Sequence, residues 1–170
     1  STVTGSPNLN LTTGTLGSGV SFPDGHILQV SNYQYNTENG WTQLGSDIDG
    51  EAGADRSGWS VSLSSDGTKV AIGSTNNDGN GNDSGHVRVY QYANNTWTKL
   101  GSDIEGEAAG DKSGYSVSLS GDGSTVAIGA PYNDNNSGEV HVYQYANNTW
   151  TQLGSDIEGE TGYGYSVSLS

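Results

Sequence analysis

An internal repeat is the feature of this sequence that most constrains its fold. Residues 90–107 read YQYANNTWTKLGSDIEGE, and residues 143–160 repeat them with a single change, Gln152 in place of Lys99. A looser copy, YQYNTENGWTQLGSDIDGE, occupies residues 33–51. Equivalent tryptophans of the three copies recur at intervals of 56 and 53 residues. A period of this length indicates stacked supersecondary units, which bury a core only against their neighbours.

Within one period, apolar and polar residues alternate as they do in half-buried strands. Residues 114–120 (GYSVSLS) alternate an aromatic or aliphatic side chain with serine. The GDG run at 121–123 predicts a hairpin turn, because glycine tolerates the positive φ that such turns demand. Further strands are expected at 124–130, 138–145 and 149–157. No segment shows a sustained helical period, so the repeat unit is predicted to be four antiparallel strands.

Four strands in about 55 residues is the size of a β-propeller blade. We therefore predict an all-β protein of repeated four-stranded antiparallel blades of β-propeller type over residues 31–170. Two complete blades are expected at 57–104 and 113–157, with a partial blade on either side. Propellers usually need about four to eight blades, so we expect either a truncated array or a homo-oligomer. Residues 1–30 are rich in Thr, Ser and Gly and predict an extended, shaft-like attachment segment.

Composition and charge exclude several functions. Only 31% of the residues are hydrophobic, and they are concentrated in short runs rich in Val, Ile, Tyr and Trp. The net charge of −14 repels nucleic-acid phosphates and anionic lipid, so we expect no nucleic-acid partner. No run approaches the roughly 20 apolar residues that span a bilayer, so we expect no membrane insertion.

One repeat resembles a known family. Residues 113–143, SGYSVSLSGDGSTVAIGAPYNDNNSGEVHVY, resemble the FG-GAP repeat of integrin α-type β-propellers. In this comparison Gly114 and Tyr115 stand for the Phe-Gly end of the motif, and the Gly-Ala-Pro at 129–131 forms its second half. The copy at 57–90 matches more loosely. The resemblance implies a propeller blade of a binding-type protein.

The chain departs from that family at the loop between the first two strands. In the family this loop often carries a calcium site with several aspartates. The corresponding loops here have a single acid each, Asp66 and Asp122. Because calcium takes about six to eight oxygen ligands, we expect plain hairpin turns at both positions.

A second acidic loop follows the fourth strand of each repeat and is the candidate metal site. Its carboxylates alternate around a glycine, which is compatible with calcium although the EF-hand spacing is not met. The candidate ligands in the two copies are Asp47, Asp49, Glu51, Asp55, Asp103, Glu105, Glu107 and Asp111. The alternative is a solvated turn, in which case the chain needs no cofactor.

The sequence offers little that is typical of catalysis, and we expect no enzyme. The three histidines do not share one repeat position, and no serine lies in a Gly-x-Ser-x-Gly elbow. Aromatic side chains are better functional candidates, because exposed rings on a rigid sheet stack on sugars. The repeated tryptophans, Trp41, Trp97 and Trp150, are instead expected to pack between blades.

Residues 17–30, GSGVSFPDGHILQV, resemble a segment of tail-fibre and other virion proteins of marine bacteriophages, especially cyanophages. An attachment segment followed by binding-type repeats is the order that an appendage needs. The sequence therefore favours a non-enzymatic structural or binding subunit of a virion appendage, located on the virion surface or outside cells. Its expected partners are other virion or surface proteins and a host-surface glycan. The alternatives are a secreted bacterial adhesin and a polysaccharide-active enzyme on the same scaffold.

Overall fold

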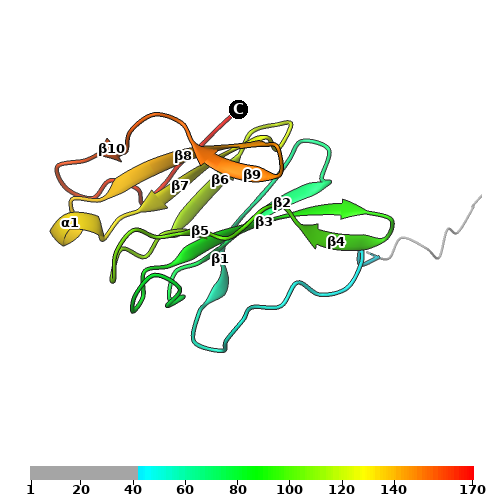
Figure 1. The fold of residues 1–170 in the computed structure, drawn as a ribbon, viewed down its shortest axis with the longest axis horizontal. Coiled ribbons are helices and arrows are strands. Elements are labelled where there is room, and N and C mark those ends of the chain that lie inside the picture. The colour runs from blue at the N-terminus through cyan, green and yellow to red at the C-terminus, as the bar shows by residue number, and fades with distance from the viewer. Residues whose placement is uncertain (1–41) are drawn as a thin grey trace, which may run out of the picture. The chain divides into compact units, whose positions relative to one another are not determined.

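The computed structural model describes residues 42–170, which form two antiparallel β-sheets (Figure 1). The strands are β1 (Ser57–Leu63), β2 (Lys69–Ser74), β3 (His86–Ala93), β4 (Thr96–Lys99) and β5 (Ile104–Glu105) in the first sheet, and β6 (Ser116–Leu119), β7 (Thr125–Ala130), β8 (Glu139–Ala146), β9 (Thr149–Gln152) and β10 (Ile157–Glu158) in the second. In each sheet the first four strands pair in sequence order, and the short fifth strand pairs with the third. The expected attachment segment and the start of the leading partial blade lie outside the described residues.

The prediction of an all-β chain built from repeated antiparallel units is confirmed, but each sheet has five strands where four were predicted. The fourth strand of the second unit is shorter than expected, since β9 ends at Gln152 and the chain turns before β10. The four-residue element α1 (Asn133–Asn136) contains left-handed residues at Asp134 and Asn135, so it is a tight loop. Among residues 42–170 no helix is long and apolar enough to cross a bilayer. Two sheets do not by themselves define a propeller, and the assignment of blades stays a prediction.

Paired asparagines form the turn between the third and fourth strands of each sheet. Asn94 and Asn95 have φ angles of 52° and 61°, and Asn147 and Asn148 have 53° and 63°. Positive φ at both central residues is the signature of a type I′ turn, whose twist matches the twist of the flanking strands. The repeated ANNT sequence therefore fixes the register of both hairpins.

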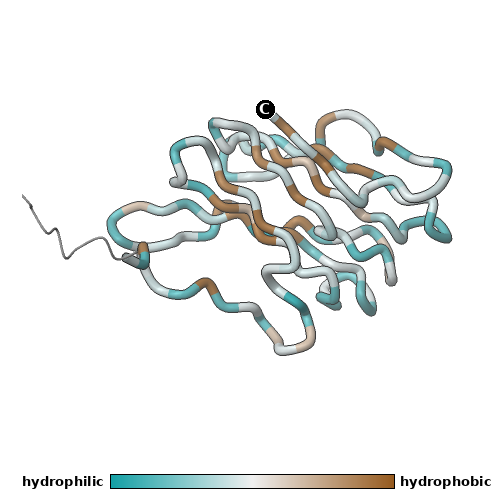
Figure 2. The backbone as a smooth tube through the Cα atoms, turned by 180° about the vertical axis from the view of Figure 1, so that it is seen from behind, coloured by the Kyte–Doolittle hydropathy of each residue, from teal (hydrophilic) through white to brown (hydrophobic). Residues whose placement is uncertain are grey.

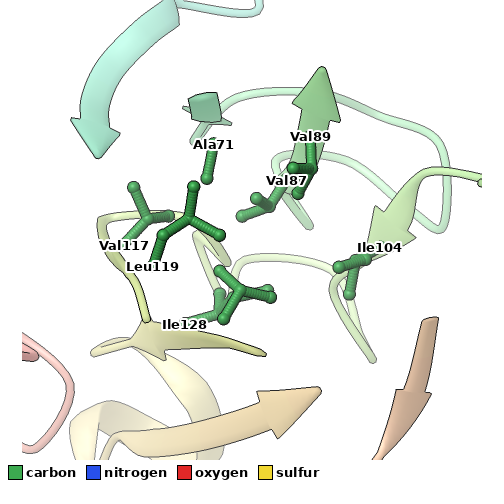
Figure 3. Packing of buried hydrophobic residues seen from close by; sticks show 8 residues of the cluster. Ala71, Val87, Val89, Ile104, Val117, Leu119 and Ile128 are labelled. Atoms are coloured by element: carbon green, nitrogen blue, oxygen red, sulfur yellow. The ribbon is translucent and has the colours of Figure 1, made fainter. Parts of the chain in front are cut away.

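The two sheets bury a shared aliphatic core between them. The first sheet contributes Ala71, Val87, Val89 and Ile104, and the second contributes Val117, Leu119, Val126 and Ile128. In Figure 3 the labelled members of this set point toward one another from both sheets. Figure 2 shows the hydrophobic segments side by side on neighbouring strands and the hydrophilic residues mainly at the turns. Neither sheet buries these side chains alone, as expected of a repeat unit.

A glycine lets the backbones of the two repeats approach each other closely. A methyl group at Gly73 of β2 would overlap the carbonyl oxygen of Gly114, which begins the second repeat. The same carbonyl accepts a hydrogen bond of 2.7 Å from the hydroxyl of Ser60 on β1. A second serine of β1, Ser62, accepts a bond of 2.9 Å from the amide of Leu119. The polar face of the first strand therefore joins one repeat to the next.

The same contact recurs one repeat further along the chain. Gly129 of β7 lies against the carbonyl oxygen of Gly164, which accepts a hydrogen bond of 2.8 Å from Ser116. The amide of Leu169 donates a bond of 3.0 Å to Ser118. Residues 164–170 therefore contact the second sheet in the same way as the start of the second repeat contacts the first sheet.

The tryptophans also connect consecutive repeats. The indole nitrogen of Trp97 donates to the carbonyl oxygen of Leu44, and that of Trp150 donates to Leu100, each at 2.8 Å. Each indole packs against a tyrosine of the preceding strand, with ring centroids 5.1 and 5.0 Å apart. Packing between repeats is confirmed for these two residues, and Trp41 lies outside the described residues.

Side chains that are buried between the sheets have exposed equivalents on the outer faces. Leu119 is 4% exposed, whereas its equivalent Leu63 in the first repeat is 60% exposed. Conversely, Ile104 is 5% exposed and its equivalent Ile157 in the second repeat is 50% exposed. Each outer face of the described pair of repeats is therefore equivalent to one of the two faces that are buried between the sheets.

Replacing Gly73 by alanine tests the close approach between repeats. We expect the added methyl group to force the sheets apart and to lower the free energy of unfolding by at least about 2 kcal/mol, as overpacking does. Gly53→Ala is the matched control, because open space surrounds Gly53, and its effect should stay within about 0.5 kcal/mol. Urea denaturation followed by tryptophan fluorescence measures both. Equal effects of the two substitutions would contradict the proposed packing.

Candidate functional site

The acidic loops do not gather their own carboxylates into a single cage. Asp55 is buried and accepts a hydrogen bond of 2.9 Å from the side chain of Asn77. Asp111 is buried and accepts one of 2.7 Å from the amide of Ala108 in its own loop. Asp47 and Asp49 are exposed. The loop aspartates therefore shape the turns, while the remaining candidate acids reach other elements.

In the first repeat, two of the candidate acids meet an arginine of β3. Arg88 forms ion pairs with Glu51 and with Asp103, the latter at 2.7 Å. Lys99 approaches the second oxygen of Asp103 to 2.6 Å. Burial opposes the charge on Asp103, but the hydrogen bonds from these two cations hold its pKa at about 2. We call this group, with His86 beside it, the arginine cluster.

His86 is the most buried member of the arginine cluster, with 2% of its surface exposed. Burial lowers the pKa of its imidazole, and the charge of Arg88 lowers it further. Its Nδ1 lies 4.0 Å from a carboxylate oxygen of Glu105, whose pKa is raised by burial. His86 is therefore a neutral ring next to an ion pair that is already balanced.

In the second repeat, the equivalent place holds a histidine and three carboxylates. Glu107, Glu139, His141 and Asp156 each offer one oxygen or nitrogen, and these atoms all lie within 4.8 Å of one another. We call this group the histidine cluster. Nε2 of His141 is 3.1 Å from Glu139 and 3.2 Å from Asp156. Gln152 donates a hydrogen bond of 2.5 Å to Asp156.

The interior of the histidine cluster is poorly satisfied. Glu139 and His141 are 3% and 2% exposed. Among the described residues, five buried side-chain atoms lack a hydrogen-bond partner. Two are Oε1 of Glu139 and Nε2 of His141, and the other three are Nδ1 of His86, Nε of Arg88 and Oε2 of Glu105 in and beside the arginine cluster. Burial raises the pKa of Glu139, because it disfavours the charged form. Such groups normally have partners, so these two atoms need an explanation.

The two clusters occupy the same positions of the repeat. In the order first repeat then second, the equivalent pairs are Glu51 and Glu107, His86 and Glu139, Arg88 and His141, Lys99 and Gln152, and Asp103 and Asp156. The backbone pairing is also equivalent, because β5 pairs with the start of β3 as β10 pairs with the start of β8. The repeats therefore share one backbone frame and differ in the charges that they place in it.

A row of aromatic rings forms a second candidate site. Trp59 and Tyr115 have ring centroids 5.4 Å apart, and Tyr115 and Tyr165 have theirs 5.3 Å apart. All three follow the glycine that begins a repeat. Tyr132 packs against both tyrosines at 6.1 Å, and the guanidinium of Arg56 lies 5.6 Å from the ring centre of Trp59. Trp59, Tyr132 and Tyr165 are exposed, so the row is open to solvent.

The two hairpin loops at Asp66 and Asp122 correspond to the loops that carry calcium in the FG-GAP family. Here each aspartate accepts hydrogen bonds from residues of its own loop. The carboxylate of Asp66 accepts hydrogen bonds from the hydroxyl of Ser64 and from the amide and hydroxyl of Thr68. Asp122 accepts the same set from Ser120 and Ser124. Each carboxylate thus acts as the centre of a turn, in agreement with the expected hairpins.

The sequence missed both groupings. The acids were grouped by loop, whereas the histidine cluster takes one ligand from a loop, two from β8 and one from the turn before β10. Its signal in the sequence is a change of charge at three positions of otherwise similar repeats, where Glu139, His141 and Gln152 replace His86, Arg88 and Lys99. The aromatic row was signalled by the glycine-aromatic step that begins each repeat. The predicted calcium ligation by the acidic loops stays a prediction.

Comparison with known families finds an FG-GAP repeat at residues 105–143. The match covers β6, β7, the first part of β8 and the connection that precedes β6. It confirms the FG-GAP resemblance of that segment. No curated protein matches the chain. Neither comparison supports the resemblance of residues 17–30 to phage proteins.

The two hairpin aspartates give a pH prediction. Hydrogen bonds from the flanking serine hydroxyl, and then from the backbone and hydroxyl two residues on, lower the pKa of Asp66 and Asp122 to about 2. Folding lowers the pKa of both aspartates, so their ionised carboxylates stabilise the folded state. This stabilisation is complete above about pH 4, where an aspartate of the unfolded chain is ionised, and it is lost as the pH falls toward 2. Carboxyl NMR titration measures both values directly.

Substitution provides the control for this titration. Asp66→Asn with Asp122→Asn should make the free energy of unfolding less dependent on pH between about 4 and 2. Either single variant should lose about half of that dependence. Ordinary carboxyl titration of both residues in the native protein would contradict the assignment.

Proposed function

We propose that this chain is a non-enzymatic binding subunit that displays its repeats outside a cell or on a virion. The observation that carries the proposal is the exposed aromatic row on a rigid sheet scaffold. The FG-GAP repeat at residues 105–143 supports a binding role. Tryptophan, tyrosine and arginine, which make up or flank the row, are also the side chains enriched at binding hot spots.

The chemistry of the row favours a carbohydrate ligand. A sugar ring has apolar C–H faces that stack on aromatic rings, while its hydroxyl groups stay hydrated. The row combines tilted and edge-on ring pairs, so it presents ring faces and ring edges in different directions. The chain has a net charge of −14 and repels polyanions. We therefore propose a neutral glycan as the ligand, in preference to one rich in sulfate or uronic acid.

The proposal of where the chain acts, on a virion or on a cell surface, comes from the sequence. Residues 17–30, with their resemblance to marine-phage virion proteins, precede the repeats and support a tail fibre or other appendage. A secreted bacterial adhesin is the second candidate, and it uses the same row for the same chemistry. Other virion or surface proteins are the proposed structural partners.

The aromatic row is tested by two substitutions and a neighbouring control. Trp59→Ala and Tyr165→Ala should each weaken binding to neutral polysaccharides at least about tenfold, equivalent to about 1.4 kcal/mol. Tyr163→Ala is the control, because Tyr163 is equally exposed and has no ring partner in the row. A glycan array followed by calorimetry on the best neutral polysaccharide gives the affinities.

Two outcomes count against the carbohydrate proposal, and a third counts against a non-enzymatic role. Binding that is unaffected by Trp59→Ala and Tyr165→Ala would remove the row from the site, and a preference for uronic-acid polymers would contradict the charge argument. Release of shorter oligosaccharides in the same assay would establish the enzymatic alternative.

We also propose that the exposed outer faces join copies of this chain. The face around Leu63 is equivalent to the face around Leu119, which is buried against the first sheet. The face around Ile157 is equivalent to the one around Ile104, which is buried against the second. Since each outer face matches one half of a contact already made within the chain, a second copy fits in a head-to-tail arrangement.

Light scattering tests this association. The chain should form oligomers whose mass rises with concentration, and Leu63→Asp should shift them toward the monomer. Thr98→Asp is the control, because Thr98 is exposed on β4, at the opposite end of the strand order from β1 and Leu63. A native chain that stays monomeric at high concentration would overturn the proposal.

A further inference from the structure

We propose that the histidine cluster is a binding site for one divalent transition-metal ion of the zinc type. Its ligands are Nε2 of His141 and carboxylate oxygens of Glu107, Glu139 and Asp156. This inference concerns a different part of the molecule from the aromatic row and does not depend on the proposed glycan binding.

The distances in the cluster fit a small metal ion. Zinc holds nitrogen and oxygen ligands at about 2.0–2.2 Å, which places neighbouring ligand atoms roughly 3.3 Å apart in a tetrahedron. Nε2 of His141 already lies 3.1 and 3.2 Å from two of the carboxylates. All four ligand atoms lie within 4.8 Å of one another. Small side-chain movements are enough to close the shell around one ion.

The type of ligand selects the class of metal. Imidazole suits zinc, copper, iron and nickel, whereas calcium takes oxygen ligands and prefers more of them than this cluster offers. The proposed site is therefore distinct in chemistry from the calcium loops considered in the sequence. It also lies away from the hairpin loop at Asp122, where the resembling family carries its calcium.

The first repeat shows what the histidine cluster lacks. In the arginine cluster, the charges of Glu51 and Asp103 are matched by the charges of Arg88 and Lys99. At the equivalent positions of the second repeat, the acids are kept, but His141 and Gln152 replace the two cations. Glu139 replaces a neutral histidine and adds a further acid. A divalent ion supplies the positive charge that the guanidinium and ammonium groups supply in the first repeat.

The buried atoms of the cluster point to the same ligand. Oε1 of Glu139 and Nε2 of His141 lie 3.1 Å apart in the interior, and the geometry there gives neither atom a hydrogen bond. A buried acceptor and a ring nitrogen left without partners are costly. Coordination of one metal ion satisfies both at once. Glu107 is exposed and Asp156 is partly buried, so the ion reaches the cluster from their side.

The metal would tie the repeats together. Glu107 lies in the connection that leaves the first sheet after β5, whereas Glu139 and His141 belong to β8. Asp156 precedes β10, which pairs with β8. An ion held by all four would fasten the connecting segment to the second sheet. In the first repeat the ion pair between Glu51 and Arg88 makes the equivalent link.

Zinc titration of the full chain tests the site. Isothermal calorimetry with zinc should show one high-affinity equivalent, and calcium titrated in parallel should not displace it. His141→Gln and Glu139→Gln should each weaken zinc binding at least about tenfold. Mutation of residues that only hydrogen-bond to a metal's ligands already causes a loss of this size. His86→Gln, at the repeat position equivalent to Glu139, is the matched control and should leave the affinity unchanged.

A swap between the repeats provides the second arm. Glu139→His with His141→Arg and Gln152→Lys copies the arginine cluster into the second repeat and should abolish the high-affinity equivalent while keeping the fold. The reciprocal change, His86→Glu with Arg88→His and Lys99→Gln, should create a second equivalent. Circular dichroism verifies that each variant is folded.

Imidazole NMR of the native chain keeps the proposal testable if a variant does not fold. One equivalent of zinc should shift the ring nitrogens of His141 and leave those of His86 unchanged. Zinc affinity that survives His141→Gln in a folded variant, or a zinc-induced shift confined to the other histidines, would overturn the proposal.

Discussion

Each repeat meets the next through a glycine that allows two backbones to touch, and the rest of the described structure depends on this approach. With hydrogen in place of a methyl group at Gly73, the carbonyl of Gly114 comes close enough to accept the hydroxyl of Ser60. The aliphatic side chains of both sheets then come within packing distance. A wider separation would leave a core of mostly Val and Ile unfilled, because these side chains are too short to bridge a gap.

The same frame carries two different arrangements of charge. One neutralises its acids with Arg88 and Lys99, and the other surrounds His141 with three carboxylates. Repetition keeps the backbone constant, so a few substitutions change the chemistry at one position without changing the fold. The exchange of Lys99 for Gln152 is the only difference between two eighteen-residue copies. This exchange falls within the two clusters. Lys99 places a positive charge on Asp103, whereas Gln152 donates a neutral hydrogen bond to the equivalent Asp156.

The alternating pattern was enough to predict the strands, since a period of two and the turn residues depend on neighbours in the chain. The ANNT and SGDGST turns are local in the same sense. The grouping of the acids was not predicted, because it depends on the pairing between strands. Asp156 meets His141 only because β10 lies beside the start of β8. Likewise Glu51 reaches Arg88 across thirty-six intervening residues.

The sequence by itself determined the all-β repeat unit, its antiparallel strands, its turns and the FG-GAP resemblance of residues 113–143, which the family match at residues 105–143 confirms. These follow from local periodicity and from glycine and asparagine conformations, which neighbouring residues dictate. Only the tertiary structure decided which outer faces are exposed, which rings form the aromatic row, and which acids meet a histidine. Those features depend on how one sheet lies on another. The alternation of apolar and polar residues predicts on which face of a sheet a side chain lies. It does not predict which residues of another strand or sheet lie opposite that face.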